Sequence, residues 1–263
     1  MGAMDKSTQA ADGTVGKALQ VLDMVAEKAR PVRFNDVLAE SPFPKATLYR
    51  LLQTLTSQGM LSYDEERQTY APGIRLVRLA HAAWSQSSLA PVARPFLDDL
   101  SAEIGQTIHL AQLDGGQVLY VDKRNAATPI DMFSQAGKIG PGYCTGVGKA
   151  MIAFLKPEAR EDAIKRQSFF RHTDNTLTTA EALRTELDTI REDGVAFDRE
   201  EHEVGINCIA APILSSNGRV IGALSITTSR QDYNMDDLTQ LRPQLLSTAA
   251  KIAEAAEAWQ FPG

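Results

Sequence analysis

Cysteine is scarce in this sequence, and long apolar runs are missing from it. Only Cys144 and Cys208 occur among 263 residues, and two thiols so far apart indicate a reducing compartment rather than a disulfide framework. No apolar segment approaches the length that a membrane-spanning helix needs. No charged-then-apolar leader opens the sequence. We therefore expect a cytoplasmic protein that has no membrane partner.

Metal-binding and catalytic patterns are missing as well. The four histidines and two cysteines do not have the compact spacing of a metal site. A phosphate-binding loop needs four residues between its first glycine and a Gly-Lys-Ser/Thr run. Here five residues separate Gly142 from Gly148, and Ala150 takes the Ser/Thr place. Cys144 has no histidine near it in the sequence to act as a base. From these three missing patterns we expect no metal, no cofactor and no catalytic residue.

The composition favours a globular protein with two domains. Apolar residues make up 43% of the chain, which is enough for a sizeable core, and 263 residues are comfortable for two domains. The formal net charge is −6, but residues 16–78 carry nine lysines and arginines against seven acidic residues. A mildly basic head on an acidic body is typical of proteins in which only the head binds nucleic acid.

The pattern over residues 14–73 predicts a winged helix-turn-helix domain. Helices are expected at 15–27, 35–40 and 44–57, with a sharp Ser-Pro-Phe-Pro turn before the third, and a hairpin follows at 60–71. Residues 1–13 are small and polar and are expected to be a disordered segment or tag. Residues 74–88 are expected to form a linker helix, and residues 89–263 a separate body.

The third helix has one apolar and one polar face. Leucines at i, i+3, i+4 and i+7 must point inward; they are Leu48, Leu51, Leu52 and Leu55. The N-terminal, outward residues of such a helix read base edges in the major groove, and an arginine can bind a guanine or a phosphate. The DNA-binding candidates are Lys45, Thr47, Tyr49 and Arg50, with Arg67 at the hairpin tip. The alternative is a solvated surface, above all for Arg67, whose acidic neighbours repel phosphate.

The body alternates strands and helices and reads as an α+β domain with a mostly antiparallel sheet. Asp-Gly-Gly and Ser-Asn-Gly turns join two pairs of strands. The expected strands are 107–113, 118–123, 131–135, 195–199, 208–214 and 220–228. The expected helices are 89–104, 146–155, 158–166, 180–193 and a long C-terminal one at 235–259.

Five ordered motifs connect this pattern to a known family. "GKALQVLDMV", "FPKATLYRLLQTLTSQGML", "CTGVGKAMIAFL", "DREEHEVGINCIAAPI" and "GALSIT" occur in that order. Together they resemble the IclR family of bacterial transcriptional regulators, from about Thr14 to the end. The segments "TIHLAQLDGGQVLYVDK", "DMFSQAGK" and "AAKIAEAAEAWQFP" are most similar to the subgroup that senses 2-keto-3-deoxygluconate. The resemblance implies a GAF-like effector-binding domain and a dimer, possibly a tetramer, on a pseudo-palindromic DNA operator.

The resemblance also implies an effector site in the body. The matching positions are Met132, Gly146, Val147, Asp198, Cys208, Ser225 and Thr227, and possibly His109 and Tyr120 on adjacent strands. The chemistry suits a hydroxylated acid, because backbone N–H groups at a helix start bind carboxylates. Hydroxyls two residues apart on a strand share one face. The structural alternatives stay open: the glycine can serve a turn, the cysteine the core and the aspartate a cap.

The sequence thus predicts a DNA-binding regulator that responds to a small acid. The first expectation is a repressor of sugar-acid (pectin/uronate) catabolism that is released by 2-keto-3-deoxygluconate. One alternative is a regulator that senses 4-hydroxybenzoate or protocatechuate, and another is a metabolite-binding enzyme with an accessory helix-turn-helix. Dimer contacts are expected along a stripe of the linker helix, namely Leu76, Leu79, Ala80, Ala83 and Trp84.

Overall fold

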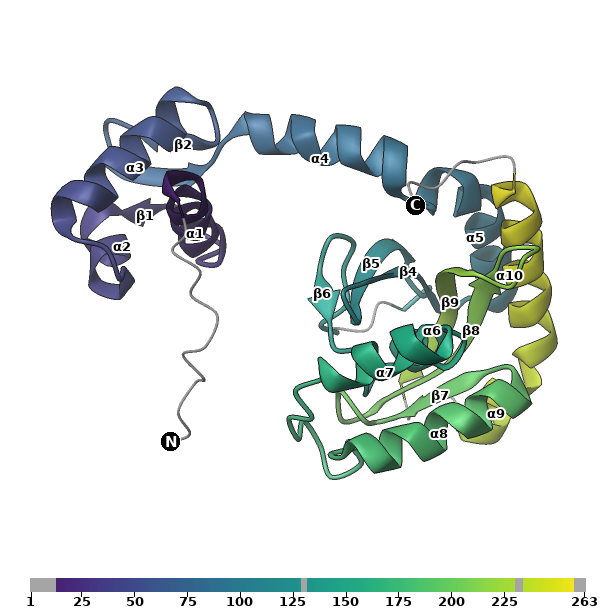
Figure 1. Ribbon diagram of the computed structural model, residues 1–263. Coiled ribbons are helices and arrows are strands. Elements are labelled where there is room, and N and C mark those ends of the chain that lie inside the picture. The colour runs from purple at the N-terminus through teal and green to yellow at the C-terminus, as the bar shows by residue number, and fades with distance from the viewer. Residues whose placement is uncertain (1–12, 129–131, 230–233, 258–263) are drawn as a thin grey trace. The chain divides into compact units, whose positions relative to one another are not determined.

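Two compact units make up the chain, each with its own core. The computed structural model describes residues 13–128, 132–229 and 234–257, so the expected disordered segment 1–13 lies outside the described residues except for Gly13. The units comprise residues 1–85 and 86–263 (Figure 1). Their cores are built from different buried residues, so each unit has its own source of hydrophobic stabilisation.

The first unit is a winged helix-turn-helix, as predicted. Its helices are α1 (Thr14–Ala26), α2 (Phe34–Glu40) and α3 (Lys45–Ser57), and its antiparallel strands are β1 (Val32–Arg33), β2 (Leu61–Asp64) and β3 (Thr69–Pro72). Pro44 caps α3 with φ −56°, close to the helical value, which explains why the helix begins directly after it. All four leucines expected to point inward are buried.

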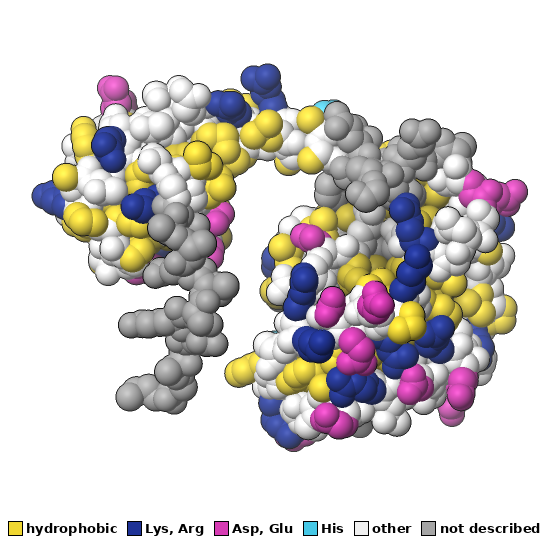
Figure 2. Space-filling view, in the orientation of Figure 1, with side chains coloured by type: hydrophobic (Ala, Val, Ile, Leu, Met, Phe, Trp, Pro, Cys, Tyr) yellow, Lys and Arg dark blue, Asp and Glu magenta, His cyan; other side chains and the backbone are white. Residues whose placement is uncertain are grey.

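The linker helix α4 (Ile74–Ser87) differs from the expected stripe in one respect. Leu76 packs against the core of the first unit and is only partly exposed. Its neighbours Ile74, Val77 and Leu79 are 74%, 62% and 50% exposed, and Figure 2 shows hydrophobic side chains along this helix. The exposed apolar face of α4 therefore includes Ile74 and Val77, which the sequence stripe left out. The side chain of Trp84 lies outside the described residues.

The second unit is built on a six-stranded antiparallel sheet. The strand order is β6-β5-β4-β9-β8-β7, and every pairing is antiparallel. The strands are β4 (Thr107–Asp114), β5 (Gln117–Arg124), β6 (Ile139–Gly140), β7 (Ala196–Arg199), β8 (Ile206–Leu214) and β9 (Val220–Ser229). The helices are α5 (Ala90–Ile104), α6 (Gly146–Ala153), α7 (Pro157–Lys165), α8 (Ala180–Asp193), α9 (Met235–Gln240) and α10 (Arg242–Ala256).

Helices cover both faces of this sheet (Figure 1). Ala111, Ala210 and Ala223 point toward α6 and α8 and share a core with them. Their neighbours along the strands point to the other face, which α5 and α10 cover. Strands β8 and β9 are accordingly buried along nearly their whole length, which is the pattern of strands covered on both sides.

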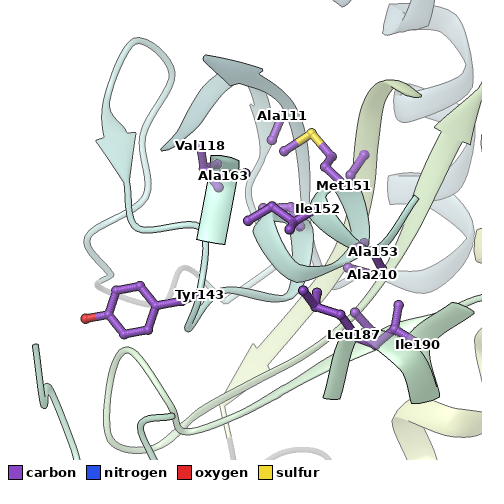
Figure 3. Packing of buried hydrophobic residues seen from close by; sticks show 14 of the residues in the cluster. Ala111, Val118, Tyr143, Met151, Ile152, Ala153, Ala163, Leu187, Ile190 and Ala210 are labelled. Carbon is purple, nitrogen blue, oxygen red and sulfur yellow. The ribbon is translucent and has the colours of Figure 1, made fainter. Parts of the chain in front are cut away.

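Helix α6 lies unusually close to the sheet because its first turn contains glycines. A Cβ on Gly146 would lie 2.5 Å from Cys208 Sγ, and one on Gly148 would lie 2.6 Å from Gly142 Cα. Figure 3 shows the next turn of α6, Met151 and Ile152, packed between the sheet and α8. Gly146 therefore sets how close the N-terminus of α6 lies to strand β8, and Gly148 sets how close it lies to the preceding loop at Gly142.

Two expected elements of the body are wrong. Residues 132–135 form no strand, because their polar groups bond to side chains instead: the Phe133 N–H donates to both Glu203 oxygens, and the Ser134 carbonyl accepts from Lys123. The expected helix 235–259 is interrupted at Leu241 between α9 and α10. Pro243 explains the break, since it lacks an N–H and its ring clashes with the preceding turn.

The close approach of α6 predicts a large effect of one methyl group. Gly148→Ala should lower the free energy of unfolding of the second unit by at least about 2 kcal/mol, because backbone must move to admit the Cβ. Urea unfolding of the full chain measures this value. Gly13→Ala is the matched control, since nothing lies within 4 Å of its added Cβ. Equal stability of the two variants would contradict the packing described for α6.

Candidate functional site

The outward face of α3 carries the predicted DNA-contacting side chains in an accessible arrangement. Lys45, Tyr49 and Arg50 are exposed and Thr47 is half-buried. Within the described part of the chain, no acidic side chain forms an ion pair with Lys45 or Arg50. Two cations without acidic partners on the leading turns of a recognition helix can meet phosphates and base edges without breaking an internal bond.

A groove of about 740 Å³ runs from the start of α3 to the wing. Its lining residues are Arg33, Phe34, Asn35, Lys45, Ala46, Tyr49, Tyr63, Gln68 and Tyr70. The pairing of β1 with β3 brings Arg33 beside the wing, opposite Thr69. Arg33 was missed in the sequence, because a two-residue strand leaves no recognisable pattern. Tyr63 and Gln68 lie in the predicted hairpin, but the sequence did not show that they face α3. Arg67 does not line the groove; it is 79% exposed at the hairpin tip, 3.9 Å from Asp64.

All nine effector candidates of the body lie around a single cavity. It is lined by His109, Tyr120, Met132, Gly146, Val147, Asp198, Cys208, Ser225 and Thr227, joined by Ser134, Thr145, His202, Glu203 and Ile206. Strand register explains the grouping: Asp198 pairs with Cys208, which pairs with Thr227, and His109 pairs with Ser225. The sequence places these residues far apart, and the antiparallel sheet brings them into adjacent rows. Their role in effector binding stays a prediction.

Three of the five additional lining residues come from less regular segments. Ser134 belongs to the irregular segment after Met132, and His202 and Glu203 lie in the loop between β7 and β8, while Ile206 is the first residue of β8. The motif "DREEHEVGIN" contained His202 and Glu203, yet alternation along a strand gives no guide to side-chain direction in a loop. Thr145 is the N-cap residue of α6.

His109 organises the hydroxyl groups on the floor of the cavity. Its Nε2 lies 2.7 Å from Ser134 Oγ, and its Nδ1 lies 3.1 Å from Thr227 Oγ1 and 3.4 Å from Ser225 Oγ. Burial, and to a smaller degree the Lys123 ammonium, lower the pKa of His109 to about 3. The imidazole is therefore neutral and offers one donor and one acceptor to the hydroxyls.

Asp198 is a buried carboxyl group with a second carboxylate close by. Its Oδ1 accepts the Glu201 N–H at 2.8 Å. Burial and then the neighbouring Glu201 carboxylate raise the pKa of Asp198 to about 7. At neutral pH both protonation states of Asp198 are therefore populated: a carboxylic acid that can donate a hydrogen bond and a carboxylate that accepts one.

Behind Asp198, a fully buried ammonium joins α6 to the loop after β7. Lys149 Nζ lies 2.5 Å from Glu201 and 2.9 Å from Glu186. Burial would lower the pKa of Lys149, but the Glu201 and Glu186 carboxylates outweigh it and raise that pKa. The second Glu201 oxygen, Oε2, is buried without a hydrogen-bond partner. Removing one charge of this pair would leave an uncompensated buried charge.

The cavity is small in this structure. Its volume is about 30 Å³, which holds about two water molecules. A ligand of more than a few non-hydrogen atoms would extend beyond this volume, into the open side of the cavity or into space that its wall vacates. The segment 132–134 is the irregular part of its wall and is held by bonds from Glu203, His109 and Lys123.

The described residues contain neither a membrane-spanning helix nor a metal cluster. No helix in the described ranges is long and apolar enough to cross a bilayer. No three His, Cys, Asp or Glu side chains in those ranges are grouped so that they hold a metal ion. Burial is also the first cause that raises the pKa of Cys144 and Cys208, so both thiols stay protonated and are poor nucleophiles.

The raised pKa of Asp198 predicts a pH-dependent contribution to stability. Between about pH 4 and pH 7 the unfolded chain has released this proton and the folded chain retains it, so stability falls as pH rises through that window. From pH 4 to 7 the free energy of unfolding of the wild-type protein should fall by up to about 4 kcal/mol relative to that of Asp198→Asn, at 1.36 kcal/mol per unit of pKa shift. Urea unfolding of both proteins across the window measures the difference. A constant difference would mean that Asp198 titrates normally.

Comparison with known proteins agrees with the geometry. The IclR helix-turn-helix domain matches residues 14–65, and the C-terminal domain of bacterial transcriptional regulator IclR matches residues 81–254. The HTH-type transcriptional regulator XynR of Escherichia coli is 32% identical over 242 residues, covering 92% of this chain and 96% of XynR. KdgR of the same organism is 29% identical over 249 residues, covering 95% and 94%.

A solved structure shares the fold at lower identity. It is an IclR homologue from Microbacterium hydrocarbonoxydans complexed with 4-hydroxybenzoate, with a TM-score of 0.79 and 22% identity over 94% of this chain and all of that one. At that identity the likeness shows the fold alone. The two domain matches cover most of the chain, and the family consists of transcriptional regulators, so the alternative of an enzyme is excluded. The chain belongs to the IclR family of bacterial transcriptional regulators, which bind DNA and small-molecule effectors.

Proposed function

We propose that this regulator is a cytoplasmic repressor of sugar-acid catabolism and that a small keto sugar acid, such as 2-keto-3-deoxygluconate, releases it from its operator. One observation supports the choice of effector above all. The cavity is lined by four serine and threonine side chains and a neutral imidazole beside the N-terminus of α6; the four are Ser134, Thr145, Ser225 and Thr227. Such a lining matches a ligand that has several hydroxyls and one carboxylate.

The carboxylate of the effector fits at the start of α6. Backbone N–H groups there have no partner within the helix, and the helix dipole favours negative charge. Gly146 and Val147 line the cavity at this point, and the close contact of Gly146 with Cys208 keeps the helix start against the sheet. The effector hydroxyls then face Ser225 and Thr227, and Asp198 can accept or donate a hydrogen bond.

DNA binding requires two copies in this proposal. One α3 fills one major groove, so a pseudo-palindromic operator needs two heads spaced by the helical repeat of DNA. The exposed apolar residues of α4, Ile74, Val77 and Leu79, offer a surface for a second copy. Two such dimers pair through their bodies into a tetramer in this proposal. The wing contributes through the groove beside α3, where Arg33 and Lys45 supply positive charge.

The effector acts only if it prefers one arrangement of the protein. A ligand shifts an equilibrium by no more than its difference in affinity for the two states. The small cavity provides such a difference if the effector occupies space that the cavity wall vacates. By reciprocity, operator binding must weaken the affinity for the effector by the same factor.

An aromatic acid is the second candidate effector. The rings of His109 and Tyr120 lie 5.4 Å apart at the cavity wall, tilted by 60°, and could receive a third ring. The homologue with 4-hydroxybenzoate is a precedent within the fold. The polar lining favours the sugar acid, because its hydroxyls can exchange hydrogen bonds with Ser134, Ser225 and Thr227, whereas an aromatic ring offers them few such groups.

Arg50 tests the DNA surface. Arg50→Ala should weaken binding to genomic DNA fragments that the wild-type protein selects by about 1–3 kcal/mol, roughly fivefold to 150-fold. Titration of labelled fragments measures the affinity. Arg191→Ala is the matched control, an exposed arginine on α8, and its affinity should stay near that of wild type. Equal affinity of Arg50→Ala and wild type would remove α3 from the interface.

Thermal unfolding tests the effector class. At a concentration a hundredfold above Kd, 2-keto-3-deoxygluconate should stabilise the protein by about 2.7 kcal/mol, and 4-hydroxybenzoate and protocatechuate should have no effect. Asp198→Ala should lose this stabilisation and its release from DNA while retaining operator affinity. Stabilisation by the aromatic acids alone would select the second candidate. An unchanged effector response of Asp198→Ala would place Asp198 outside the binding site.

A further inference from the structure

The charges around the cavity are unfavourable for a bare carboxylate ligand. None of the described lining residues is a lysine or an arginine, and two of them, Asp198 and Glu203, are acidic. An acid effector that enters this space brings a further negative charge close to both. Because the site is desolvated, like charges repel strongly there. The complex therefore needs a positive counterpart beyond the partial charge at the N-terminus of α6.

The titratable groups that face Asp198 do not supply this positive charge. They are Glu201, His202 and Glu203 on the same loop, Lys149 on α6, Cys144 before α6, Cys208 on β8, Tyr120 on β5 and His109 on β4. The Lys149 ammonium is engaged by Glu186 and Glu201. Burial raises the pKa values of both thiols and of Tyr120, so these groups are neutral, as is His109.

His202 is the remaining candidate for a positive charge, and it already faces an acid. Its Nδ1 lies 3.6 Å from Glu203 Oε1, and its ring lies 4.8 Å from that of His172. Even a protonated His202 would at most balance Glu203. The Glu203 carboxylate is in turn held by the Phe133 N–H at 3.1 and 3.2 Å, and its pKa is lowered although burial alone would raise it.

We propose that each acid effector is taken up together with one proton from solvent, and that Asp198 carries this proton in the complex. The inference rests on the proposed function, since it requires an acid effector. Asp198 is placed for the role because one oxygen is fixed by the Glu201 N–H at 2.8 Å, which leaves the other free for a proton. The carboxylic acid then donates an O–H to the effector carboxylate, a strong charge-assisted hydrogen bond.

Proton uptake gives the affinity a defined pH dependence. Free Asp198 already has a pKa raised to about 7 by burial and Glu201, and a bound carboxylate raises it further. Above about pH 7 the affinity should fall about tenfold for each pH unit, until the pKa of the complex is reached. Below about pH 6 it should be nearly constant, because Asp198 is protonated before and after binding.

Calorimetry in buffers of different protonation enthalpy counts the protons directly. We expect about one proton taken up per 2-keto-3-deoxygluconate bound at about pH 8 in phosphate and in Tris. Asp198→Asn should bind with no uptake and no pH dependence, since the amide keeps the acceptor for Glu201. His202→Gln is the matched control and should retain the uptake. If Asp198→Asn fails to fold, the wild-type protein still tests whether a proton is taken up, and His202→Gln still tests whether His202 carries it.

Running pyruvate, gluconate and 4-hydroxybenzoate in parallel separates this inference from the proposed function. If 2-keto-3-deoxygluconate binds without proton uptake, the proton inference is wrong and the effector stands. If another acid binds instead and takes up a proton, the effector is wrong and the inference stands. Uptake that is lost in His202→Gln and kept in Asp198→Asn would assign the proton to His202 and overturn the inference. If no acid binds at any pH, both are overturned.

Discussion

The arrangement of the cavity in the second unit depends on the short distance between the first turn of α6 and strand β8. Gly146 faces Cys208 and Gly148 faces Gly142 at separations that leave no room for a Cβ. This contact places the N–H groups of α6 beside the hydroxyls of β9, and it brings Lys149 within reach of Glu201. The core behind it is unusually rich in alanine, which permits such a close approach of helix and sheet.

Most of the fold could be predicted because its elements obey local rules. Helix α8 occupies the residues that periodicity gave it, 180–193, and the leucine face of α3 is buried as expected. The expected strand at 131–135 was wrong for a reason that lies far away in the sequence. The apolar pair Met132-Phe133 favoured a strand there, but Glu203 binds the Phe133 N–H that a strand partner would need. Strand β1 was too short to be recognised.

The candidate site shows the same division between local and distant causes. Residues on strands and at the helix start were found from the motifs, because strand pairing fixes which side chains share a row. His202 and Glu203 were missed because their directions are set by contacts of the loop with Phe133 and His172. For Arg67 the sequence predicted the position, at the tip of the wing. It did not show which acidic neighbour the guanidinium would lie beside, and in the structure this neighbour is Asp64.

The size of the cavity has a consequence for what the protein can sense. Moving the wall at 132–134 to admit a larger ligand costs work, and this work is subtracted from the affinity that the contacts alone would give. A wall that needed less work would shift the response to lower ligand concentrations.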